Sequence, residues 1–185
     1  NKKLILFLFL KHQKFIKKKR KKKLLINSKK RILCGKLRKG HFEGVIDIID
    51  RFLQIINPKY MFLGEKDYQQ LFLIKKYVKE KFKVKIIPCK TIRDKNYVAL
   101  SSRNLLLSKK NLVTAGKISK KLYFFKKKIK NNYNYKKNIN YIKDYLIKNY
   151  GIKIDYLELR NEKDLSFSKS KSKFRLFIAY HINKV

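Results

Sequence analysis

Residues 63–71 read LGEKDYQQL, and their surroundings indicate a strand, a glycine turn and the start of a helix. The apolar run before them is typical of a strand, whereas the run after them, Leu71–Phe82, is amphipathic. Gly64 can adopt unusual backbone angles and lets a ligand approach the chain, and Asp67 suits a helix N-cap, where unpaired N–H groups attract anions. Lys66 adds a positive charge, and the two glutamines could bind a neutral or carboxylate ligand. We therefore expect a phosphate-handling site.

A parallel sheet is expected around this turn. Strand-like runs at Tyr60–Leu63 and Val84–Ile87 flank the helix, and an earlier helical pattern covers about residues 42–56. Short loops between alternating helices and strands imply right-handed crossovers and parallel pairing. Ligands of such sheets bind beyond the carboxyl ends of the strands. The turn at residues 63–67 and the segment after Ile87 should therefore face one crevice.

Two further segments carry candidate site residues. Residues 40–45 read GHFEGV, where His41 could donate a proton or bind a substrate oxygen, or could simply close the loop as a cap. Residues 99–104 read ALSSRN, and two hydroxyls followed by a guanidinium suit a triphosphate. Serine and asparagine are also ordinary turn residues, so residues 99–104 alone are weak support for a triphosphate site. Their expected position on the same sheet as the glycine turn strengthens that interpretation.

The chain is strongly basic, with a formal net charge of +39 from 51 Lys+Arg against 12 Asp+Glu. A surplus of this size suggests nucleic acid or an anionic membrane surface. The basic residues are almost all lysine, however, and they are spread along the whole sequence, which resembles compositional drift more than a dedicated binding face. Non-specific binding to polyanions such as RNA follows in either case.

The remaining composition indicates a cytoplasmic protein without a membrane span. Cys34 and Cys89 form neither a disulfide framework nor a zinc site, and reduced thiols are expected. No run reaches the ~18 apolar residues of a membrane helix. Residues 4–10 are apolar but short and lack a cleavage site, so a buried strand at Leu4–Phe9 is preferred to a signal peptide. His12 is interpreted as a surface residue, and the absence of an initial Met suggests a fragment.

The order and spacing of three motifs resemble the pantothenate synthetase (pantoate–β-alanine ligase) family. The motifs are GHFxGV at residues 40–45, NPxxxxxGEKDYQQL at residues 57–71 and LSSRN at residues 100–104. The resemblance is clear from about Ile32 to Ser108 and fainter beyond. It implies an α/β fold, in which residues 1–108 form a partial Rossmann-like nucleotidylyltransferase-type parallel sheet. Residues 109–185 would form a small α+β lid domain, with helical patterns at 112–128 and 139–150 and strands at 155–159 and 174–179.

The resemblance also implies a two-step reaction with ATP and Mg²⁺. Pantoate would attack the α-phosphate of ATP, and β-alanine would then displace AMP from pantoyl adenylate to give pantothenate. Lys66 and Arg103 would stabilise charge, and Gln70 and His41 would bind pantoate, with no protein metal site and no tightly bound prosthetic group. The residues implied for ATP binding are Gly64, Glu65, Lys66, Asp67, Ile92, Leu100, Ser101, Ser102 and Arg103. A homodimer is usual for this family.

The sequence departs from the family pattern in several places. The His-x-Gly-His element that carries the family's assigned catalytic acid is missing, and the first βαβ unit is missing with it. We therefore expect a chain that is incomplete at both ends and does not make pantothenate alone at a useful rate. Lys39 replaces a common proline, and Asn96-Tyr97 replace an Asp-Gly turn, which would stiffen the loop before Ser101.

Other functions remain open on sequence grounds. A basic RNA-binding protein would use the lysines and interleaved aromatic residues, and a degenerate ligase remnant would not fold stably, although the regular apolar periods argue against decay. A different adenylate-forming ligase would leave Gln70 and the GHF loop unexplained. The serine–lysine repeat at residues 168–173 resembles the KMSKS loop of tRNA synthetases only in composition, because it follows a C-terminal strand, and a polar hairpin loop suffices.

Overall fold

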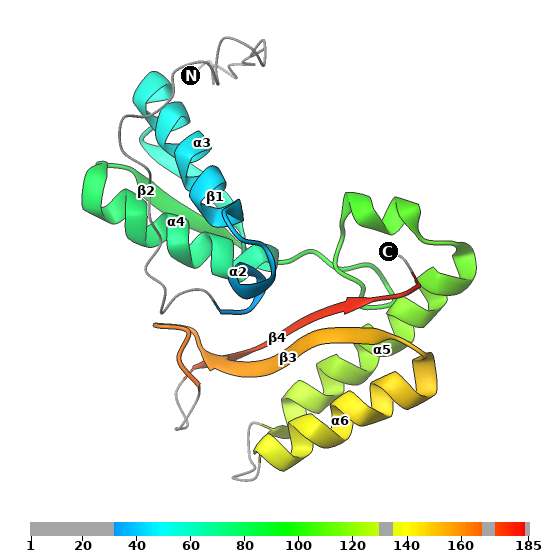
Figure 1. Ribbon diagram of the computed structural model, residues 1–185. Coiled ribbons are helices and arrows are strands. Elements are labelled where there is room, and N and C mark those ends of the chain that lie inside the picture. Colours follow the sequence, from blue (N-terminus) through cyan, green and yellow to red (C-terminus); the bar gives the residue numbers. More distant parts are fainter. Residues whose placement is uncertain (1–31, 130–134, 168–172, 184–185) are drawn as a thin grey trace.

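The computed structural model describes residues 32–129, 135–167 and 173–183 (Figure 1). The described elements are α2 (Cys34–Leu37), α3 (His41–Ile56), β1 (Tyr60–Gly64), the 3₁₀ helix η2 (Glu65–Asp67), α4 (Tyr68–Lys81), β2 (Lys85–Cys89), the 3₁₀ helix η3 (Ser102–Leu106), α5 (Lys109–Ile129), α6 (Tyr135–Tyr150), β3 (Lys153–Asn161) and β4 (Phe174–His181). The expected strand at residues 4–9, His12 and most of the serine–lysine repeat lie outside the described residues.

The first part of the chain forms the expected parallel pair of strands. β1 and β2 pair in parallel, with Tyr60 opposite Lys85 and Gly64 opposite Cys89, and α4 connects them. α3 ends at Ile56, and its C-cap residue Asn57 takes a left-handed conformation before Pro58. α4 begins at Tyr68, earlier than the apolar period alone suggested, because the turn itself continues into the helix through η2. The core between these elements consists of Leu53, Leu71, Ile74, Val78 and Ile86.

The last part of the chain is an antiparallel hairpin covered by two helices. β3 and β4 pair from Lys153 opposite His181 to Asn161 opposite Phe174. α5 and α6 pack on one face of this hairpin, and their apolar residues, such as Ile118, Ile142 and Leu146, form one buried core with it (Figure 1). Val98 is also buried in this core, and Leu107 packs against it, so the core includes residues that precede the expected boundary at Ser108.

The β3–β4 hairpin lies between the two helix layers, with α2 and α4 on its other side (Figure 1). Cys34 Sγ and Tyr156 Oη are 2.8 Å apart across this contact. Both cysteines are free thiols. None of the described helices is long and apolar enough to cross a membrane.

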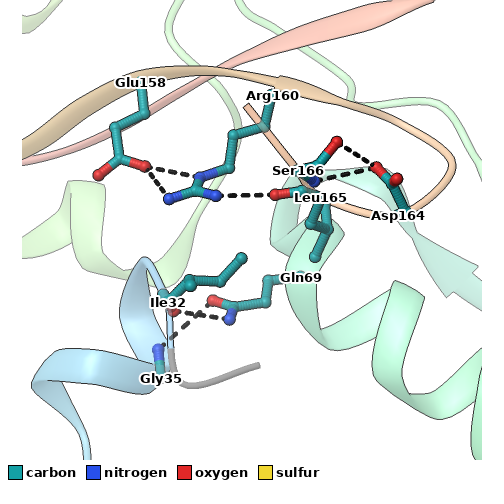
Figure 2. A network of polar contacts seen from close by, with 8 residues as sticks. All are labelled: Ile32, Gly35, Gln69, Glu158, Arg160, Asp164, Leu165 and Ser166. Carbon is teal, nitrogen blue, oxygen red and sulfur yellow. Dashed lines mark hydrogen bonds and ion pairs between the residues drawn. The ribbon is translucent and has the colours of Figure 1, made fainter. Parts of the chain in front are cut away.

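Two separate polar networks lie beside this contact, one in α4 and the segment before α2 and one in the hairpin (Figure 2). The Gln69 side chain donates to the carbonyl of Ile32 at 2.7 Å and accepts from the amide of Gly35 at 3.4 Å. Arg160, which is buried, pairs with Glu158 and donates to the carbonyl of Leu165 at 2.8 Å. These bonds satisfy polar groups that burial would otherwise leave unpaired.

Candidate functional site

The Gly64–Asp67 turn lies at the carboxyl end of β1, where ligands of parallel sheets bind. Gly64 has an ordinary extended backbone (φ −70°, ψ 134°), so the turn does not use the unusual angles that glycine permits. A Cβ at this position would meet no atom within 4 Å, which leaves the backbone open to a ligand. Asp67 occupies the N-cap position of α4 without a side-chain capping bond, and it faces Lys66 at 3.7 Å instead. Lys66 and Asp67 are exposed, which suits contact with an incoming ligand.

The two glutamines after the turn have different surroundings. Gln69 is buried and bonded to Ile32 and Gly35, so the expectation that both glutamines could bind a ligand is wrong for Gln69. Its amide instead ties α4 to the chain segment that enters α2. Gln70 is half-buried one residue further along the helix. Gln70 is therefore the member of the pair that stays a ligand candidate.

His41 lies at the start of α3, after Gly40, which occupies the N-cap with a left-handed φ of 75°. Partial burial lowers the pKa of His41, and the charges on Arg38 and Arg103 lower it further, while Asp67 raises it. A charge changes a pKa noticeably only at short range. Arg103 in the SSRN loop and Asp67 in the glycine turn therefore both act on His41 in the GHF loop.

The Ser101–Arg103 loop is held by its own hydrogen bonds and presents its charged side chain outward. Ser101 Oγ accepts from the amide of Arg103 at 3.3 Å, and the Asn104 side chain donates to the carbonyl of Ala99 at 3.0 Å. The amide of Leu100 donates to the carbonyl of Ile92 at 3.0 Å, which joins these two candidate residues. The side chains of Ser102 and Arg103 are exposed. Such a preformed loop can present hydroxyls and a guanidinium to an anion.

Tyr97 anchors the segment before Ser101 to α5 through contacts between aromatic rings. It adopts a left-handed φ of 68°, which is costly for a residue with a bulky side chain. Its ring lies 4.8 Å from that of Tyr123 and 6.3 Å from that of Phe124, both on α5. Asp94 Oδ1 accepts from the amides of Asn96 and Val98 at 2.8 and 2.9 Å. These contacts support the expectation that the Asn96-Tyr97 replacement stiffens the loop.

A family model for pantoate–β-alanine ligase matches residues 7–185, almost the whole chain. The chain belongs to this family. The pantothenate synthetase of Clostridium botulinum is 38% identical over 158 residues, covering 82% of this chain and 55% of that protein. The pantothenate synthetase of Wigglesworthia glossinidia brevipalpis is 44% identical over 140 residues, covering 72% and 49%. The chain thus spans about half the length of the curated relatives it matches.

Solved structures of pantoate–β-alanine ligases have the same fold. The pantothenate synthetase of Thermus thermophilus matches with a TM-score of 0.77 at 24% identity, covering 87% of this chain and 59% of that one. The Francisella tularensis ligase, solved with β,γ ATP and β-alanine, matches with a TM-score of 0.62 at 34% identity, covering 84% and 52%. The resemblance inferred from the motifs and the expected α/β fold are confirmed.

Mg²⁺ is implied by the ligase family, and the described residues offer it little. In the described ranges, no three His, Cys, Asp or Glu side chains gather in a way that could hold a metal ion. At the turn, Glu65 pairs with Arg175, and Asp67 pairs with Lys66. Mg²⁺ in phosphoryl-transfer sites commonly keeps its waters and binds substrate phosphates. The described side chains therefore do not fit a protein-held Mg²⁺ site.

A pocket of about 310 Å³ lies between α4 and the end of the hairpin. It is lined by Ile32, Phe72, Leu73, Arg160, Asp164, Leu165, Ser166 and Phe167, none of which is a predicted site residue. Arg38, which acts on His41, and Arg175, which pairs with Glu65, had no predicted role. Their rarity among so many lysines was the signal that could have singled them out, since arginine is preferred for specific ion pairs.

Proposed function

We propose that the chain is the pantoate- and phosphate-binding part of an ATP-dependent pantoate–β-alanine ligase. The observation that carries this proposal is the family match over residues 7–185, supported by the action of Arg103 and Asp67 on the pKa of His41. Each motif comes from a different loop, and we propose that all three line one site beyond the parallel strands. The products would be pantothenate, AMP and pyrophosphate.

The proposed chemistry needs charge stabilisation from this part of the protein. A pantoate carboxylate oxygen forms a bond to the α-phosphorus of ATP, and the bond to the bridging oxygen breaks to release pyrophosphate. The β-alanine amine then forms a bond to the acyl carbon, and AMP leaves. Lys66 and Arg103 would neutralise the negative charge that develops on phosphate oxygens, and neither needs to transfer a proton. Mg²⁺ would enter on the nucleotide and add to this neutralisation.

The other site residues would bind and orient the substrates. Gln70 would hold pantoate by hydrogen bonds, and His41, whose pKa is lowered, would be neutral at pH 7 and suited to bond a substrate hydroxyl or carboxylate as a neutral partner. The residues proposed to surround ATP are Gly64, Glu65, Lys66, Asp67, Ile92, Leu100, Ser101, Ser102 and Arg103. By family resemblance we also propose a division near residue 108, a homodimer and a cytoplasmic location.

Nucleotide binding tests this proposal directly. We expect Lys66→Ala to weaken ATP binding by roughly tenfold or more, because a charge-assisted contact to phosphate is lost. Lys83→Ala is the matched control, since Lys83 is an exposed lysine just after the other end of α4. Isothermal titration with ATP measures both affinities, and a coupled AMP assay with pantoate and β-alanine checks the expectation that this chain alone turns over little. Equal ATP affinities for the two variants would refute the proposed site.

Polyanion binding is a second candidate function, favoured by one surface of α5. This helix carries lysines along its length and no acidic residue, and Lys127 Nζ lies 4.8 Å from the ring centre of exposed Tyr123. Lysines with interleaved aromatic rings suit single-stranded nucleic acid. Such binding would weaken steeply with salt and would be indifferent to Lys66→Ala, which separates it from the ligase proposal.

A further inference from the structure

Arg175 on β4 joins two carboxylates from distant parts of the chain. Its Nη2 lies 3.2 Å from Glu65 Oε2, in the glycine turn, and its Nε lies 3.3 Å from Glu162 Oε1, just after β3. The Nε contact is an ion pair without hydrogen-bond geometry. The side chains of Arg175 and Glu65 are only 23% and 27% exposed, so solvent screens this pair less than a surface pair.

Tyr68, the first residue of α4, belongs to the same cluster. The Arg175 guanidinium lies 4.1 Å from the centre of its ring, within cation–π range. Its hydroxyl donates to the carbonyl of Glu162 at 3.1 Å, and its ring meets the edge of Phe177 on β4 at 6.0 Å. β4 and the chain after β3 therefore hold both ends of the 3₁₀ helix that follows Gly64.

The turn depends on this cluster because its other side chains do little to hold it. Lys66 and Asp67 are exposed, and Asp67 makes no capping bond. Glu65 also poses an electrostatic problem, since an unpaired carboxylate one residue after Gly64 would repel a phosphate at the turn. Arg175 cancels that charge while leaving Lys66 exposed for the ligand.

We propose that Arg175 is a positioning residue for the phosphate-binding turn: through Glu65 and Tyr68 it couples β4 to the turn and masks the Glu65 carboxylate. That the turn binds phosphate rests on the proposed function, whereas the coupling between β4 and the turn does not. Arg175 acts through its neighbours and needs no contact with the substrates.

Hydrogen–deuterium exchange without nucleotide tests the coupling. We expect Arg175→Gln to speed exchange of the amides in residues 65–70 by about fivefold or more, in keeping with typical coupling between sites. Lys173→Gln is the matched control, since it removes one exposed positive charge next to the same strand. Exchange in residues 65–70 that is equal in both variants would overturn the coupling, whether or not the chain binds ATP.

ATP titration tests the masking of Glu65. We expect Arg175→Gln to weaken ATP binding about fivefold or more, Arg175→Lys to restore part of the loss, and Glu65→Gln in the Arg175→Gln background to restore part as well, because it removes the exposed carboxylate. A merely structural role would give further loss in the double variant, and that result would overturn the masking. Failure of the unsubstituted chain to bind ATP would refute the proposed function and the masking, while the exchange data would still decide the coupling.

Discussion

The two halves of the molecule bury their strands very differently. None of the side chains of β1 is buried, and Phe62 at its centre is 67% exposed. β3, in contrast, buries Ile154, Leu157 and Leu159 against α5 and α6. Parallel strands are normally covered on both faces, and among the described residues the cover of β1 and β2 comes from α3 and α4. The candidate site thus lies on the half in which the described strands bury fewer side chains, and contacts from the other half reach its turn.

Local stability should follow this contrast, and the largest effects should come from core truncations. Leu146→Ala in α6 and Leu53→Ala in α3 each remove most of a side chain that is almost fully buried. Each change should lower the free energy of unfolding by about 3 kcal/mol. We expect Leu53→Ala to reduce amide protection only in α3, α4, β1 and β2, while β3 and β4 stay protected. Hydrogen exchange under native conditions measures this, with Ile147→Ala, at 40% exposure, as the control. Simultaneous loss of protection in both halves would show that they form one cooperative unit.

A smaller loss of stability is expected when the hydrogen bond between Asp50 on α3 and Tyr77 on α4 is removed. Asp50, 2% exposed on α3, accepts hydrogen bonds from Tyr77 on α4 and from Gln54. Tyr77→Phe leaves the buried carboxylate with one donor fewer, and we expect a loss of about 1–2 kcal/mol in unfolding free energy. Urea denaturation measures it, and Tyr141→Phe, at 69% exposure on α6, should change stability by less than ~0.5 kcal/mol. Equal effects would mean that helix packing alone holds α3 to α4.

The smallest expected effect tests whether the candidate site is assembled in solution. Arg103→Gln should raise the pKa of His41, and Asp67→Asn should lower it, because the two charges act on the imidazole with opposite sign. Both changes should shrink with added salt. Proton NMR of the His41 ring measures them, with Arg51→Gln, further along α3, as the control. If the pKa of His41 does not change in Arg103→Gln, the SSRN loop does not lie next to His41 in solution.

The same histidine gives a pH dependence with a definite sign. The pKa of folded His41 lies below the ordinary value of 6.5, so the unfolded chain takes up this proton first as the pH falls. The native state therefore loses stability as the pH drops from 6.5 towards the lower folded pKa. His41→Gln should flatten that part of the stability–pH curve, and urea midpoints between pH 7 and 5 measure it. An unchanged curve would contradict the lowered pKa.

Much of the fold could be predicted because it depends on local patterns. The apolar periods located α3, α4, α5 and α6, and the short loops around α4 predicted the parallel pairing of β1 with β2. The start of α4 at Tyr68 agrees with the predicted N-cap at Asp67, although the apolar period itself begins only at Leu71 and carries no information about the 3₁₀ helix η2. The motif spacing likewise identified the family, since a phosphate turn and a loop at the carboxyl edge of one sheet constrain both residue type and distance along the chain.

By itself, then, the sequence determined the strand–turn–helix at residues 60–81, the parallel sheet, the family and the candidate residues. The tertiary structure alone decided which of two adjacent glutamines is buried, and how the pKa of His41 responds to Arg103. It also decided that Glu65 pairs with Arg175, far away along the chain. The reason is physical. Backbone preference and apolar period are properties of neighbouring residues, whereas burial and charge pairing depend on segments that only packing brings together.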